Sequence, residues 1–207
     1  MSFEGASLDI TYTIRYITDM DNREALLDGA LEEFVARGYE GTGVQLLCER
    51  GDVTKPTLYY YFSNKVGVLE ALLERELADV LSRFLEDSSD TADVTSSLFA
   101  LSKHFLGSLA RRSLAGQLFL QLSCQPIHSE ACTAFSPYRE KMHAALVSFF
   151  KAAEAQHGNF RGRSQEYAIL FGGFLNSLLR MVIERGTQNS DEELRALLHR
   201  FEHGIYS

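Results

Sequence analysis

Three consecutive tyrosines, Tyr59, Tyr60 and Tyr61, stand between Lys55 and Lys65 in the stretch TKPTLYYYFSNK (54–65). A tyrosine offers an apolar ring and a hydroxyl that exchanges hydrogen bonds, and a lysine adds a positive charge. Such a set suits a surface that contacts an anionic and partly apolar partner, such as a phosphate backbone. Because the whole chain has a formal net charge of -8, this chemistry must act locally.

A second group has the spacing of metal ligands. Cys124, His128 and Cys132 lie four residues apart and would present three soft ligands on one side of a continuous helix. Pro126 argues against that helix, because proline lacks the N–H that an interior helical position uses. We therefore expect buried thiols and surface histidines here, and no metal site.

Signatures of catalysis are weak. The sequence has no glycine-rich phosphate loop, no nucleophile elbow and no alternation of strands and helices. A carboxylate-bridged metal enzyme requires repeated Glu-x-x-His pairs, and the nearest match, Glu140 with His143, occurs once. His199 and His203 form an i, i+4 pair on the last helix, which we interpret as surface. We expect neither an enzyme nor a cofactor.

The composition is that of a globular protein. The chain has 207 residues, of which 45% are hydrophobic and 23% charged, enough for a sizeable core. The longest apolar stretch, 168–183, carries Asn176, Ser177 and Arg180, so it falls short of a membrane helix. No secretion signal is evident at the N-terminus, and three cysteines make no disulfide framework. These features favour a protein of the reduced cytoplasm.

Hydrophobic periodicity predicts an all-α fold of about nine helices. Residues 8–17 alternate apolar and polar and give the one strand-like signal. A first helix follows up to Gly38, a short second helix spans about 43–50, a third starts at the capping residue Thr54, and a long fourth spans 65–86. Five further helices are expected at about 91–111, 113–123, 128–157, 163–186 and 190–205. The predicted domains are an extension (1–19), which is either an arm or precedes a start at Met20, a three-helix domain (20–66) and a helical domain (67–207).

The third helix has one buried face. Leu58 and Phe62, at i and i+4, point to the core, which leaves the tyrosines on the outside. Two short helices joined by a tight turn, with polar and aromatic groups exposed on the second, are typical of a helix-turn-helix that reads DNA. Residues 1–86 hold 8 Lys/Arg against 16 Asp/Glu, which opposes that function. Within 42–65, however, there are three basic and two acidic residues, so the local charge is slightly positive.

The segment from about Arg23 to Leu73 resembles the N-terminal domain of TetR-family transcriptional regulators. The resemblance is carried by FVARGYEGTGV (34–44), VTKPTLYYYFSNK (53–65) and VLEALLE (68–74). It implies a DNA-binding regulator, most often a repressor, that binds a palindromic operator as a homodimer and is released by a small-molecule effector. Two departures stand out: the turn reads Gly51-Asp52 where the family usually has Ala-Gly, so Asp52 must carry the left-handed conformation, and Gln45 replaces the more frequent arginine or another polar group.

The resemblance also implies roles for individual residues. The recognition helix would present Pro56 to base methyl groups, Thr57 and Tyr59 to phosphate or base, and Tyr60 and Tyr61 to the groove wall and a phosphate. The expected DNA-binding residues are Thr42, Gln45, Thr54, Lys55, Pro56, Thr57, Tyr59, Tyr60, Tyr61 and Lys65. Base readout would fall to Lys55, Thr57 and Gln45, because lysine pairs with guanine and glutamine with adenine.

The helical domain is expected to bind an effector and to dimerise. Apolar and aromatic residues on its middle helices are candidates for an effector pocket: Phe99, His104, Phe105, Phe119, Leu122, Phe135, Tyr138 and Met142, with His128 and His143 as further polar candidates. The lining predicts a small apolar or aromatic molecule. The last two helices would form the dimer interface through Ile169, Gly172, Gly173, Asn176, Leu179, Arg180, Leu194, Leu198 and Phe201. A protein-docking module and a metal-responsive sensor are the alternatives.

Overall fold

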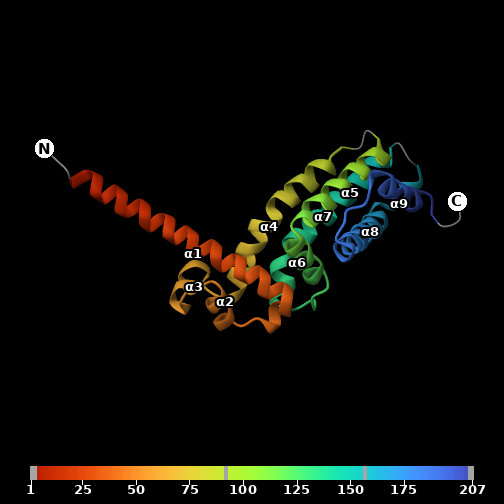
Figure 1. Cartoon of the computed structure of the whole chain (residues 1–207). Helices are drawn as coiled ribbons and strands as arrows, with labels where there is room; N and C mark the ends of the chain where they lie inside the picture. The colour runs from red at the N-terminus through yellow and green to blue at the C-terminus, as the bar shows by residue number, and fades with distance from the viewer. Residues whose placement is uncertain (1–3, 91–92, 156–157, 205–207) are drawn as a thin grey trace. The chain divides into compact units, whose positions relative to one another are not determined.

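The computed structural model describes the backbone of residues 4–90, 93–155 and 158–204, and side chains from Asp21 onward except that of Asn159. Within these ranges the protein is all-α, as the periodicity predicts (Figure 1). The elements are α1 (Glu4–Gly41), α2 (Val44–Arg50), α3 (Lys55–Phe62), α4 (Lys65–Asp87), α5 (Val94–Arg111), α6 (Ser113–Ser123), α7 (Glu130–Ala153), the 3-10 turn η1 (Gly158–Phe160), α8 (Ser164–Arg185) and α9 (Asp191–His203).

The strand-like signal at residues 8–17 is wrong, because the backbone of this segment is helical and belongs to α1. Residues 6–28 contain neither glycine nor proline, so nothing in the sequence stops a helix there. Gly38 breaks the helical geometry, with φ 76° and ψ 162°, and a last turn follows it. This break lies at the predicted end of the first helix.

The chain divides into two compact units, Met1–Leu72 and Leu73–Ser207, which we call the head and the body. The head holds α1, α2, α3 and the first turns of α4, and the body holds the rest. The core of the head contains large side chains with no exposed surface: Leu26, Leu27, Phe34, Leu47, Leu58, Leu69 and Leu72.

In the body, α7 and α8 lie side by side, and α5 packs against α6, α8 and α9 (Figure 1). Its core is rich in aromatic rings. Phe84, Phe105, Phe119 and Phe135 form a chain of edge-to-face contacts with centroid distances of 5.3 to 5.8 Å. Among the described residues, α8 is the one helix long and apolar enough to cross a membrane by length and composition, which is weak evidence because core helices pass the same test.

Candidate functional site

The turn between α2 and α3 places the third helix on the outside of the head. Asp52 has φ 49°, so it carries the left-handed conformation that the departure Gly51-Asp52 implies. A Cβ atom at Gly51 would lie 2.8 Å from Cα of Leu26, so the turn packs directly on α1. The N–H of Val53 donates to the carbonyl of Cys48 at 3.0 Å and closes the turn.

The two faces of α3 differ sharply in exposure. Leu58 is fully buried and Phe62 is 6% exposed, whereas Tyr59 is 46% and Tyr60 77% exposed. The Thr54 hydroxyl accepts a hydrogen bond from the N–H of Thr57 at 3.3 Å, which caps the start of the helix. The buried residues and the cap hold α3 in place, and Tyr59 and Tyr60 are thereby kept at the surface.

The remaining candidates on this surface differ in exposure and in hydrogen bonding. Lys55 and Pro56 are exposed, Tyr61 is half-buried, and the Gln45 amide donates to the Glu49 carboxylate at 3.0 Å. Gln45 must leave that partner before it can pair with a base. The sequence signal identified these residues because each lies on α2 or α3 opposite the buried leucines.

Thr42 and Lys65, both expected to contact DNA, also make contacts within the head. Thr42 is fully buried, and its hydroxyl donates to the carbonyls of Gly38 at 2.8 Å and Glu33 at 3.2 Å. The ammonium group of Lys65 donates to the carbonyl of Tyr39 at 3.0 Å and lies 3.9 Å from the centroid of that ring. Thr42 therefore stabilises the end of α1, and Lys65 ties the start of α4 to it.

A buried carboxylate joins α1 to α2. Glu33 is 2% exposed, and its two oxygens lie 2.7 Å from Nε of Arg37 and 2.6 Å from Nε of Arg50. Burial raises the pKa of Glu33, but the hydrogen bonds and charges of the two arginines outweigh it and hold the pKa below its ordinary value. Sequence reasoning missed this residue, because Glu33 sits among other acids on α1 and only the tertiary contact distinguishes it.

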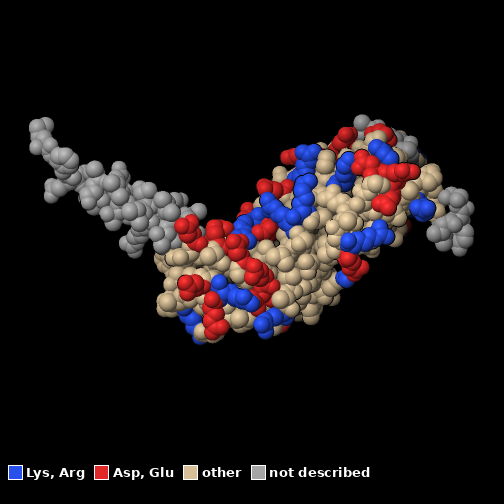
Figure 2. All heavy atoms as spheres, viewed as in Figure 1, with Lys and Arg blue, Asp and Glu red and all other residues tan. Residues whose placement is uncertain are grey.

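The described part of the head offers few cations to an anionic partner. Arg37 and Arg50 contact Glu33, Arg23 contacts Glu24 at 2.8 Å, and Lys65 is held by α1. Lys55, on α3, is the exposed basic side chain of this part without an ion pair. On the face shown in Figure 2, acidic and basic side chains of the head are interspersed and form no continuous basic stripe.

The body contains an apolar cavity of ≈ 180 Å³. It is lined by residues of α4 to α8: Phe84, Phe105, Phe119, Ser123, Phe135, Arg139, Met142, His143, Leu146, Ala168, Ile169, Gly172, Gly173, Leu175 and Asn176. Four phenylalanine rings meet the polar side chains of Arg139, His143, Ser123 and Asn176 there. Of the predicted pocket residues, Phe105, Phe119, Phe135 and Met142 lie on this cavity, as does His143.

The other four pocket candidates do not line this cavity. His104 lies with Nδ1 2.8 Å from an oxygen of Asp87, and the guanidinium of Arg195 covers the ring of Phe99 at 3.8 Å. Leu122 is 2% exposed and is packed in the core. The Tyr138 hydroxyl donates to Glu74 at 3.1 Å, and its pKa is raised to about 12 by burial and by that hydrogen bond and charge.

The expected dimer residues fall into two sets. Leu179, Leu194 and Leu198 are at most 3% exposed within a single chain, and the ring of Phe201 makes a tilted contact with that of Phe171 at a centroid distance of 5.3 Å. These side chains already have apolar partners in the same chain. Gly172 and Asn176 line the cavity, as do Ile169 and Gly173, which also face outward.

An apolar surface remains on the outer side of α8. Ile169 is 64% exposed and Leu170, which the sequence analysis did not select, is 59% exposed. Gly173, Ser177 and Arg180 continue this exposed row along the helix. The part of the predicted dimer face that one chain leaves open is therefore confined to α8.

Cys124, His128 and Cys132 lie between the end of α6 and the first turn of α7, and among the described residues they do not form a group of close ligand atoms. Cys124 and His128 are exposed on either side of Pro126, while Cys132 is buried. Cys132 lies in α7, after the capping residue Ser129, whereas Cys124 and His128 lie in the segment that joins α6 to α7.

The head matches a known family. The model of the family described as bacterial regulatory proteins, tetR family, matches residues 26–72. The transcriptional activator FasR of Mycolicibacterium smegmatis is 30% identical over 122 residues, which cover 55% of this chain and 56% of FasR. A fatty acid metabolism regulator protein of Bacillus subtilis is 24% identical over 136 residues, covering 64% of this chain and 70% of the relative.

The fold extends the similarity beyond the head. The crystal structure of the transcriptional regulator FadR from Bacillus subtilis in complex with stearoyl-CoA superposes with a TM-score of 0.70. It has 17% sequence identity and covers 88% of this chain and 99% of FadR. The chain spans 56% of the length of FasR, so that relative supports the family and not a shared activity. The head therefore belongs, over residues 26–72, to the TetR family of bacterial regulatory proteins, and the chain shares the fold of FadR along most of its length.

Proposed function

We propose that this protein is a ligand-responsive, DNA-binding transcriptional regulator that acts as a repressor. The observation that carries the proposal is α3, on which Lys55, Tyr59 and Tyr60 are exposed and Thr57 is half-buried, while Leu58 is fully buried. A short capped helix of this kind fits the major groove of B-DNA, which is about 12 Å wide.

The side chains of α3 divide between positioning and readout. The hydroxyl of Tyr59 and the ammonium of Lys55 suit phosphate oxygens, whereas Thr57 and the ring of Tyr60 suit base edges and thymine methyl groups. Gln45 reads an adenine once it releases Glu49. Phosphate contacts fix the register of the helix, and the base contacts give the sequence preference.

A homodimer explains how such a small surface finds one operator. Two heads contact half-sites about 34–36 Å apart on one side of the duplex, so the operator is palindromic. The exposed row Ile169, Leu170, Gly173 and Arg180 on α8 is the surface we assign to the partner copy. Gly173 allows the two helices to approach closely, and Ile169 and Leu170 become buried when the partner binds.

The cavity of the body is the site we assign to the effector. Its four phenylalanines suit an apolar acyl or aromatic group, while Arg139 and His143 offer donors to a carbonyl or carboxylate. FadR, which shares the fold, holds stearoyl-CoA, and this supports an acyl thioester as the class to test first. At ≈ 180 Å³ the cavity is smaller than the roughly 300–1,000 Å³ of drug-sized sites, so it favours short acyl groups.

Effector binding would act through α4. This helix carries Phe84 at the cavity and Lys65 at its other end, so a shift of its C-terminal half changes the end that belongs to the head. A ligand moves this equilibrium only by its preference for one arrangement over the other. In the arrangement that the effector favours, the two heads of the dimer would no longer have the spacing of the two half-sites.

The test is selection of random DNA duplexes by the purified protein, followed by sequencing, at two salt concentrations. Enrichment of a palindrome supports the proposal, and binding to it is then titrated with acyl-CoA esters of increasing chain length. Release of DNA by one length class supports the effector assignment. If no sequence is enriched while mass spectrometry finds no ligand bound to the protein, the head does not read DNA and the proposal fails.

The cavity assignment has its own variant. A Cβ atom at Gly172 would lie 3.9 Å from Cδ1 of Leu146, so Gly172→Ala adds a methyl group to the cavity without a clash. Alanine also stabilises a helix by about 0.5–1 kcal/mol relative to glycine. We expect a higher melting temperature together with weaker effector binding, and unchanged effector binding would place the ligand elsewhere.

A further inference from the structure

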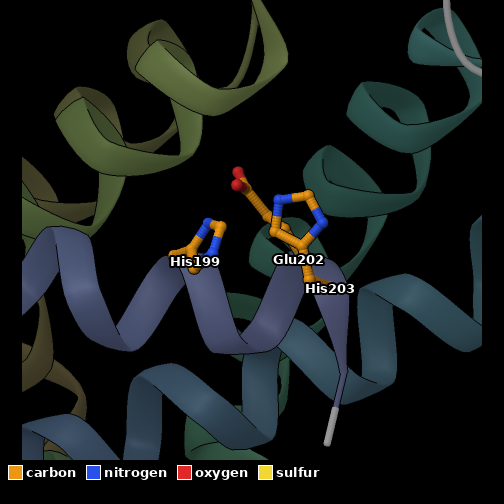
Figure 3. Close-up of side chains that lie close together, drawn as sticks. All are labelled: His199, Glu202 and His203. Atoms are coloured by element: carbon orange, nitrogen blue, oxygen red, sulfur yellow. The ribbon is translucent and has the colours of Figure 1, made fainter. Parts of the chain in front are cut away.

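The last turn of α9 brings together three groups that the proposed function does not use. His199, Glu202 and His203 belong to the sequence HRFEH, and their ligand atoms all lie within 4.8 Å of one another. Figure 3 shows the Glu202 carboxylate between the two imidazole rings, above the same face of the helix. The ring centroids of the two histidines are 4.2 Å apart.

The distances between these ligand atoms are slightly longer than those between the ligands of a bound metal ion. Two imidazole nitrogens at 2.0–2.1 Å from a tetrahedral Zn²⁺ lie about 3.3 Å apart. A change of side-chain rotamer at His199 or His203 covers the difference, because both side chains are exposed. Histidines at i and i+4 on one helix face are the spacing with which zinc is held in many proteins.

Glu202 gives independent support for a cation. Its Oε1 atom is buried and has no hydrogen-bond partner among the described residues. The side chain borders a second cavity of ≈ 220 Å³, together with Leu98, Tyr167 and Phe201. An unsatisfied carboxylate oxygen in such surroundings is costly, and a bound cation would satisfy it. The C-terminal end of a helix, where this group lies, also favours positive charge.

The helix that carries the three ligands is held firmly by its neighbours. Leu194 and Leu198 are buried, and a capping box between Ser190 and Glu193 fixes its start. Lys103 of α5 pairs with Asp191 of α9 at 2.7 Å. A ligand set on a fixed helix loses little freedom when the ion binds.

We propose that His199, Glu202 and His203 form a binding site for a divalent transition-metal ion, with Zn²⁺ as the first candidate. Two imidazoles and one carboxylate are the ligands that suit Zn²⁺, Ni²⁺ and Cu²⁺, whereas Mg²⁺ and Ca²⁺ prefer oxygen alone. Three protein ligands leave one tetrahedral position to water or to a group that enters from the second cavity. This site is separate from the effector cavity and does not depend on the proposed function.

The test is isothermal titration of the full-length, tag-free protein with ZnCl₂ after treatment with EDTA and dialysis. We expect one ion per chain and a rise in melting temperature, because the ion binds the folded state. The double variant H199A/H203A should lose this binding, with an affinity lower by about 100-fold or more. Glu202→Gln should lower the affinity by about 10- to 100-fold, since an amide oxygen is a poorer ligand than a carboxylate.

The matched control is His128→Ala, which removes an exposed histidine from the other cysteine and histidine group. It should bind Zn²⁺ like the wild type. Titration with Co²⁺ gives a second readout, because cysteine ligation adds a thiolate charge-transfer band that His and Glu ligands lack. Circular dichroism verifies that H199A/H203A is folded. Wild-type affinity in that folded variant, or a thiolate band with Co²⁺, would overturn the proposal.

Discussion

Substitutions at two adjacent residues of α3 should have different effects: one should lower the stability of the head, and the other should lower its affinity for DNA. Leu58 is fully buried, whereas Tyr59 is 46% exposed. Replacing a buried leucine by alanine costs about 2–5 kcal/mol, which lowers the ratio of folded to unfolded head roughly 30-fold or more. Replacing Tyr59 by phenylalanine keeps the ring and removes one exposed hydroxyl, so stability should change by at most about 0.5 kcal/mol.

The effect on DNA binding runs in the opposite order. A hydrogen bond from the Tyr59 hydroxyl to a phosphate is worth about 1.5–3 kcal/mol, as for other hydrogen bonds to charged groups. A dimer loses two such bonds, so Tyr59→Phe should weaken operator binding by about 10²- to 10⁴-fold. Leu58→Ala, in contrast, weakens binding only as far as the head unfolds.

Urea denaturation followed by circular dichroism measures the stability, and fluorescence anisotropy with the selected operator measures the affinity. Binding is compared at low denaturant and low temperature, where more of the Leu58→Ala head is folded. Wild-type affinity in Tyr59→Phe at both salt concentrations would show that this face of α3 does not lie on the phosphates. A Leu58→Ala protein of wild-type stability would contradict the assignment of the buried face.

Three other variants test the head and the dimer. Lys55→Ala should reduce the slope of log affinity against log salt by about 1 for each head, whereas Lys65→Ala, which loses the tie to Tyr39, should lower the melting temperature of the head. Glu33→Gln should remove acid sensitivity: the lowered pKa of Glu33 means that its stabilisation is complete above about pH 4.5 and is lost as pH falls through the lower folded value, which pH-dependent melting measures. Leu170→Lys should give monomers in sedimentation, and an unchanged dimer would exclude the α8 face.

Sequence reasoning works best where the signal is local. The cap at Thr54, the buried pair Leu58 and Phe62, and the left-handed Asp52 all depend on residues within a few positions of one another, and the structure confirms each. The error at residues 8–17 has the same origin. Alternation over ten residues is weak evidence against a helix when no glycine or proline separates the segment from a strong helix behind it.

Partners in space are harder to predict than faces of helices. The spacing shows that α8 and α9 each have an apolar side, but it does not show whether Leu179 and Leu198 pack in their own chain or against a copy. The structure buries both within one chain. Arg139 and Phe84 line the cavity but are not among the predicted pocket residues, because each comes to the cavity from a different helix and only the tertiary fold brings them together.

The distribution of charge in the head bears on how an acidic protein can select one DNA site. Arg37 and Arg50 are held by Glu33 and Arg23 by Glu24, which leaves Lys55 on α3 as the exposed, unpaired basic group among the described side chains of the head. If one cation per head neutralises a phosphate, counterion release contributes a slope of only about -2 for a dimer, against about -10 for strongly basic DNA-binding proteins. Non-specific affinity is then low, and hydrogen bonds and apolar contacts from Thr57, Tyr59 and Tyr60 must supply more of the binding free energy. Such a head binds DNA in general weakly but discriminates strongly between its operator and other sequences. Base contacts are lost on a wrong sequence, whereas electrostatic attraction to the phosphates is not.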